Sequence, residues 1–161
     1  MMTTRPYMNV IKAMTAGLLV ITPLLLSAAE SLDPQSSRAA RCVGIFAYSA
    51  NWFMLQDNEG AAKVMAGQMA RSQTALFSKY YANGAVAGVY AEGISAVVSS
   101  VKPYFDARPD ELLSSIDTCV VTTEEMVAVQ RARGVKMWGR SFEQMVTELT
   151  INLLRRMGLS E

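Results

Sequence analysis

The stretch RAARCVGIFAYSANWFMLQ, at positions 38–56, decides the fold class. Its apolar side chains recur every three or four positions, which is the period of an α-helix. Cys42, Ile45 and Phe46 belong to one apolar stripe. Val43 and Ala47 belong to a second stripe beside it. A helix that is apolar over so much of its circumference is typical of a buried position. We therefore expect it at the centre of a helical bundle.

Two helices are expected after the turn-forming residues at 57–60. The first covers 61–81 and has a row of large apolar side chains on one side. The second covers 85–101 and is apolar on one face. Pro103 should end it, because a proline ring removes a backbone donor and clashes with the preceding turn.

The C-terminal part of the chain contains three further signals of helix starts. Pro109 precedes two acidic residues, and Thr122 shortly precedes two glutamates, so we expect one helix start at each and a bend at the second. Gly134 should end this region. Ser141 with Gln144 has the spacing of a capping box and opens the last helix, which Gly158 should end. No segment alternates with the period of a strand. The sequence thus predicts an all-α fold, a small bundle of five or six helices.

The first 29 residues have the pattern of a secretory signal peptide. Arg5 and Lys12 make the start positive, the 14 residues at 13–26 carry no charge, and small residues at 27–29 fit a cleavage site before Glu30. As a helix, the uncharged stretch would span about 21 Å, which is shorter than the ~30 Å hydrocarbon core of a bilayer. We therefore expect the leader to be removed on export.

The chain then divides into a cleavable signal peptide at 1–29, a short polar lead-in at 30–37 and a single helical domain at 38–161. The expected location is the periplasm or the medium outside the cell. An uncleaved leader would instead anchor the protein N-terminally in the inner membrane. That anchor is the only contact with a membrane that we expect.

An exported domain with two cysteines is expected to join them. Cys42 and Cys119 both fall on the apolar side of a predicted helix, so both can point inward. They are far apart in sequence and lack the C-x-x-C spacing of redox motifs. We therefore expect one structural disulfide, Cys42–Cys119.

Composition excludes several classes of function. The chain has no histidine, which removes imidazole-based catalysis and the metal and haem sites that need imidazole. Of its 15 basic residues, two lie in the leader, which leaves 13 against 14 acidic residues. This balance provides no field for nucleic acid. No phosphate loop, dinucleotide fingerprint or nucleophile elbow is present. We expect no cofactor, no metal and no nucleic acid partner.

A basic stretch, RARGVKMWGR at 131–140, is the first candidate surface for a partner. Arginine next to an aromatic side chain can hold an acidic protein surface, a phosphate or a lipid headgroup. The alternative is an ordinary helix end whose tryptophan folds back into the core. The candidate binding residues are Arg131, Arg133, Lys136, Trp138 and Arg140.

A stripe of small residues is the weaker candidate. Gly84, Gly88 and Ser95 share one side of the helix expected at 85–101, and Glu92 lies on the same side. Small residues allow another backbone to approach closely. In a soluble bundle, the same stripe also fits a solvated face or tight internal packing.

These observations favour a non-enzymatic module that binds another envelope or secreted protein, as an inhibitor, immunity factor, chaperone or adaptor does. The first alternative is a carrier of a small apolar or lipid ligand, because seven methionines remain after the leader and methionine adapts to varied apolar shapes. The second alternative is a cell-wall hydrolase that uses two carboxylates brought together by the fold.

Overall fold

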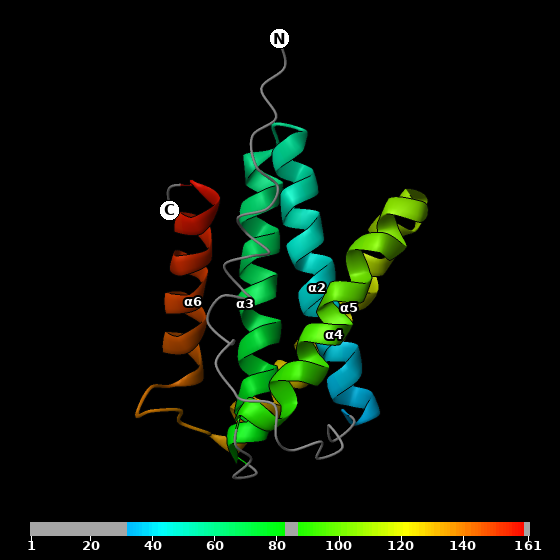
Figure 1. Ribbon diagram of the computed structural model, residues 1–161. Helices are drawn as coiled ribbons and strands as arrows, with labels where there is room; N and C mark the ends of the chain where they lie inside the picture. The colour runs from blue at the N-terminus through cyan, green and yellow to red at the C-terminus, as the bar shows by residue number, and fades with distance from the viewer. Residues whose placement is uncertain (1–31, 83–86, 160–161) are drawn as a thin grey trace, which may run out of the picture.

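The computed structural model describes residues 32–82 and 87–159. At residues 82 and 87–91 it describes the backbone only. These residues form a bundle of five α-helices that run alternately up and down in Figure 1. The helices are α2 (Pro34–Leu55), α3 (Glu59–Ala82), α4 (Ala87–Ala107), α5 (Leu112–Arg133) and α6 (Phe142–Met157), with a 3₁₀ turn, η1 (Pro109–Glu111), before α5. The all-α prediction is confirmed. The expected signal peptide lies outside the described residues.

Helix α2 is central, as its sequence predicts. Its buried residues include Cys42, Val43, Gly44, Ile45 and Phe46, five consecutive positions that together point to every side of the helix. Helices α3, α4 and α5 all pack against it. In Figure 1, α4 crosses in front of α2 and α5 passes behind it, so α2 is covered from both sides. The fifth helix, α6, packs against α3 instead.

The crossing of α2 and α4 depends on Gly44. A Cβ atom at this position would lie 2.7 Å from Cγ2 of Val101 and 3.2 Å from the Cα of Val98. Both distances are shorter than ordinary van der Waals contact, and the second atom belongs to the backbone of α4. Only glycine therefore allows α4 to approach α2 this closely.

The opposite side of α2 is joined to α5 by the predicted disulfide between Cys42 and Cys119. The two Cα atoms are 5.2 Å apart, and the bond closes a separation of 77 positions. Both cysteines are buried within the apolar core. The disulfide therefore links the central helix to a segment distant in sequence, and the prediction of a structural pair is confirmed.

The start of α2 lies at Pro34, four residues before the expected start at Arg38. Asp33 caps the helix by accepting a hydrogen bond from the N–H of Ser36 at 3.1 Å. Nζ of Lys79 on α3 donates to the same carboxylate at 2.9 Å. Partial burial alone would raise the pKa of Asp33, but the hydrogen bonds from Ser36 and Lys79 outweigh it and lower the pKa to about 2. The capping network extends the helix into residues that were expected to form a lead-in.

The prediction that Pro103 ends its helix is wrong, because α4 continues through it to Ala107. The proline removes one backbone donor, but the following turn is held by tertiary packing. Phe105 is completely buried, and its ring lies 5.7 Å from the ring of Tyr48 on α2. This burial outweighs the lost hydrogen bond.

The bend expected at Thr122 is also absent, since α5 is continuous from Leu112 to Arg133. The hydroxyl of Thr122 donates to the carbonyl of Thr118 at 3.0 Å inside the helix. Thr123 is buried against the bundle. The hydroxyl of Thr122 is therefore used within the helix, and neither threonine caps a new one.

The remaining predicted helix ends are confirmed. Gly134 and Gly158 end α5 and α6 in the left-handed conformation. Ser141 and Gln144 form the capping box of α6. Within the described ranges, no helix combines the length and apolar character needed to cross a membrane.

Replacing both Cys42 and Cys119 with alanine should lower the free energy of unfolding by about 2–5 kcal/mol, because the unfolded chain loses its cross-link. Denaturant unfolding of the oxidised proteins measures this difference. Under reducing conditions, the wild type should lose most of its advantage over the variant. Two cysteines that alkylate readily in the native exported protein would contradict the structural role.

Candidate partner-binding surface

A tight turn between α5 and α6 lies at the lower end of the bundle in Figure 1. The N–H of Met137 donates to the carbonyl of Arg140 at 3.1 Å, and the N–H of Arg140 donates to the carbonyl of Met137 at 3.0 Å. Between them, Trp138 and Gly139 have φ angles of 50° and 77°. Two successive left-handed residues are typical of a type I′ turn. Glycine adopts this conformation freely, whereas a tryptophan in it costs about 1–3 kcal/mol.

The turn sends its two large side chains in opposite directions. Met137 is 2% exposed and packs into the bundle, where its sulfur lies 3.7 Å from the hydroxyl oxygen of Ser78. Trp138 is 69% exposed, and its ring lies 5.6 Å from that of Tyr81, which is also exposed. The alternative that Trp138 folds back into the core is therefore wrong. The strained residue is the one that displays its side chain to solvent.

The four basic side chains predicted at this surface divide into two kinds. Arg131 forms an ion pair with Glu143 at 2.6 Å, and its hydrogen bond to that carboxylate raises the pKa of the guanidinium. Arg140 pairs with Glu148. Arg133 and Lys136 are exposed, and the described residues offer neither of them an ion-pair partner. The charges of Arg131 and Arg140 are therefore neutralised by neighbouring carboxylates, whereas no described carboxylate neutralises those of Arg133 and Lys136.

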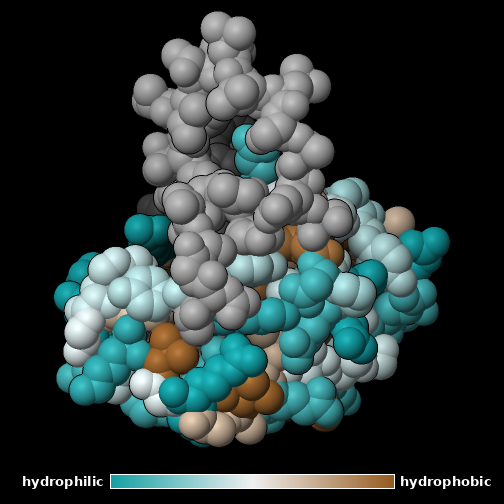
Figure 2. Space-filling view, turned by 90° about the horizontal axis from the view of Figure 1, so that it is seen from below, coloured by the Kyte–Doolittle hydropathy of each residue, from teal (hydrophilic) through white to brown (hydrophobic). Residues whose placement is uncertain are grey.

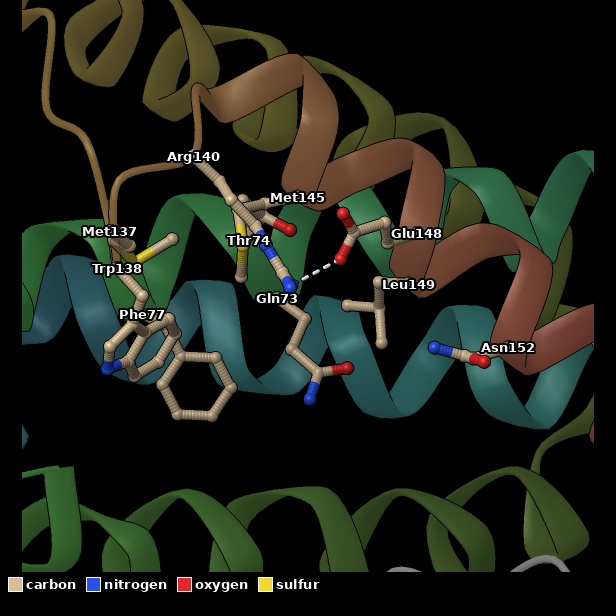
Figure 3. A pocket seen from close by; sticks show the side chains of 10 residues that line it. All are labelled: Gln73, Thr74, Phe77, Met137, Trp138, Arg140, Met145, Glu148, Leu149 and Asn152. Atoms are coloured by element: carbon tan, nitrogen blue, oxygen red, sulfur yellow. Dashed lines mark hydrogen bonds and ion pairs between the residues drawn. The ribbon is translucent and has the colours of Figure 1, made fainter.

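Beside the turn, an open groove of about 300 Å³ runs between α3 and α6. Figure 3 shows Phe77 and Trp138 together at one end, the Arg140–Glu148 ion pair in the middle and Asn152 at the other end. The groove is lined by Gln73, Thr74 and Phe77 of α3, by Met137, Trp138 and Arg140 of the turn, and by Met145, Glu148, Leu149 and Asn152 of α6.

The sequence pattern does not indicate this groove. Met145 and Leu149 lie on the apolar face of the last helix, and the structure leaves both half-buried. Helical periodicity identifies the apolar face of α6, but it does not indicate which helix that face meets. The contribution of Phe77 from α3 depends on this tertiary pairing. The only available signal was the apolar stripe itself.

The weaker candidate surface lies elsewhere, on α4. Gly84 lies outside the described residues, and Gly88 lies in the part of α4 for which only the backbone is described. Glu92 and Ser95 are exposed. Neither Glu92 nor Ser95 lines the groove beside Trp138.

The face seen from below in Figure 2 is mainly hydrophilic where it is described, with small separate hydrophobic patches. The buried polar residues of the described chain are serines, threonines and one glutamine, and none of them is a carboxylate. Among all the described residues, no three histidine, cysteine, aspartate or glutamate side chains are grouped so that they could hold a metal ion. The described surface presents charged groups, amide groups and aromatic rings.

Comparison with known proteins gives no match to this chain among family models, curated proteins or solved structures.

Replacing Trp138 with asparagine should raise the free energy of unfolding by about 0.5–1 kcal/mol. Asparagine tolerates the left-handed conformation, and Asn-Gly is a preferred pair in type I′ turns. Little buried area is lost, because the indole is largely exposed. Denaturant unfolding of the wild type and of the Trp138→Asn variant measures the difference. A clear loss of stability would show that the indole packs against the bundle more strongly than the turn strains it.

Proposed function

We propose that this protein is an exported, non-enzymatic helical module that binds another envelope or secreted protein. Inhibitors, immunity factors, chaperones and adaptors act in this way. The proposed contact surface, which we name the Trp138 surface, comprises Arg131, Arg133, Lys136, Trp138 and Arg140.

The observation that carries this proposal is the position of Trp138. A large aromatic side chain is held outside the core by a turn that would be more stable with a smaller residue. Tryptophan and arginine are enriched among the residues that dominate binding energy at protein interfaces. The reciprocal backbone hydrogen bonds fix the backbone of the turn, so little backbone freedom is lost there when a partner binds.

The proposed location outside the cytoplasm is supported by two independent features. The first is the leader pattern at 1–29. The second is the buried disulfide between Cys42 and Cys119, which is consistent with an oxidising compartment.

The two alternatives receive less support. A carrier of an apolar ligand needs an enclosed apolar cavity, whereas the groove is open and an ion pair between Arg140 and Glu148 crosses it. A carboxylate-based hydrolase needs two carboxylates facing one cleft. Only one carboxylate, that of Glu148, lines the groove. Glu143 and Glu148 both line a neighbouring hollow, but each is held in an ion pair, with Arg131 and Arg140 respectively.

The proposal is tested with the mature domain as bait in an envelope extract, followed by mass spectrometry of the captured proteins. The wild type should retain a partner that the Trp138→Ala variant loses. Arg133→Ala combined with Lys136→Ala should weaken capture, and added salt should slow association, because salt screens exposed charges.

Arg38→Ala combined with Lys63→Ala serves as the charge-matched control, since it removes two cations from other parts of the molecule. It should leave capture unchanged. Gly88→Leu tests the weaker surface on α4 and should also have no effect. A partner retained equally by the Trp138→Ala variant would refute the proposed surface.

A further inference from the structure

We propose that the groove beside Trp138 binds a short extended segment of the partner protein, with one large apolar side chain between acidic residues. This inference rests on the proposed function and names the chemistry of the partner. It is carried by the length of the groove, by its lining and by the charges at its two ends.

The length of the groove matches a short peptide. Met145, Glu148, Leu149 and Asn152 form one stripe along α6 with spacing i, i+3, i+4 and i+7. Seven residues of helix correspond to about 10 Å. An extended chain covers that distance with about three residues, since each adds about 3.3 Å.

The walls of the groove suit one large apolar side chain. Phe77, Trp138, Met145 and Leu149 contribute apolar atoms from the two helices and the turn. Figure 3 shows that they approach the groove from both sides. Methionine adapts its shape to what it contacts, and tryptophan provides a flat surface for packing. The groove can therefore accept an aliphatic or aromatic residue.

An unpartnered amide provides a site for the backbone of the bound segment. Oε1 of Gln73 is shielded from solvent and has no hydrogen-bond partner among the described residues. A buried acceptor in this state costs about 1–3 kcal/mol. Because Gln73 lines the groove, a rotation of its amide would let a backbone N–H of the segment satisfy this oxygen.

Cations lie near both ends of the groove. Lys136 and Arg133 precede Trp138 in the chain by two and five residues, are exposed, and lack ion-pair partners among the described residues. At the other end, Nη1 of Arg155 lies 3.3 Å from Oδ1 of Asn152, which lines the groove. The central pair of Arg140 and Glu148 is neutral as a unit. This distribution complements acidic residues on each side of a central apolar one.

A membrane surface fits these features less well. A bilayer presents a broad plane, whereas the apolar side chains here line a groove between two helices. Lipid binding is therefore one of the contradicting outcomes of the experiment.

The experiment uses a displayed library of random twelve-residue peptides, selected against the mature domain. The selected peptides should contain Asp or Glu on both sides of a large apolar residue. Their affinity is measured in a Trp52→Phe background, in which Trp138 is the only tryptophan. Binding should shift the Trp138 emission to shorter wavelength, because the indole leaves water.

Two variants on α6 provide a matched pair. Leu149→Glu places a charge in the groove and should weaken the selected peptides by about tenfold or more, in the range of an interface hot spot. Thr147→Glu adds the same charge at an exposed position outside the groove and should leave affinity within about twofold, as expected for a rim charge.

Reversing the charges at the two ends tests complementarity. Lys136→Glu combined with Arg155→Glu should abolish binding of the acidic peptides and favour basic ones, whereas Arg38→Glu should not. Selection of peptides without acidic residues, or equal binding to the Leu149→Glu variant, would overturn the inference. A Trp138 shift produced only by phosphatidylglycerol vesicles, or no enrichment at all, would also overturn it.

These outcomes are separate from the test of the proposed function. If the envelope partner is retained by the Leu149→Glu variant but lost by Trp138→Ala, the Trp138 surface stands and the groove proposal fails. If the partner is retained by both variants, the Trp138 surface fails as well, and if the wild type captures no partner, the proposed function itself fails.

Discussion

Helix α2 has apolar side chains around most of its circumference, and the rest of the described structure depends on covering them. Burial of one large apolar side chain contributes about 1.5–3 kcal/mol, so exposure of any side of α2 would be costly. Helix α4 covers one side through the close approach at Gly44, α5 covers another and is joined to it at Cys42, and α3 packs along it. A single helix that is apolar around most of its circumference therefore determines where three others lie.

Helix α6 occupies a different position, and the candidate site follows from it. It packs on α3 rather than on α2, so its apolar stripe is only partly covered. The groove and the turn that displays Trp138 lie along this incomplete contact. The bundle provides a rigid support, while the turn retains a strained residue whose side chain contributes little to the core. The strained turn lowers the stability of the fold while it holds an aromatic side chain at the surface, and this is a physical reason to look for binding there.

The sequence predicted the features that depend on local chemistry. The central position of α2 followed from its apolar circumference, the disulfide from two cysteines on apolar faces, and the helix ends from Gly134, Ser141 and Gly158. It failed where tertiary packing overrode local preference, as at Pro103 and in the middle of α5. The candidate surface was predicted only in part. Met137 and Trp138 are neighbouring large apolar side chains, and only the backbone of the turn decides that the first is buried and the second exposed. The groove needs the pairing of α3 with α6, which periodicity does not contain.

The central claim is that α2 is enclosed by helices in close contact with it, and one pair of matched substitutions tests it most directly. The measurement is the free energy of unfolding of Gly44→Ala and of Gly67→Ala. Both replace a helical glycine, but a Cβ at Gly44 meets α4 at 2.7 Å, whereas one at Gly67 has no neighbour within 4 Å. The account predicts opposite signs: a loss of about 1–3 kcal/mol at Gly44 through overpacking, and a gain of about 0.5–1 kcal/mol at Gly67 through helix propensity. Stabilisation by both substitutions would show that α4 does not lie against α2, and would contradict the account.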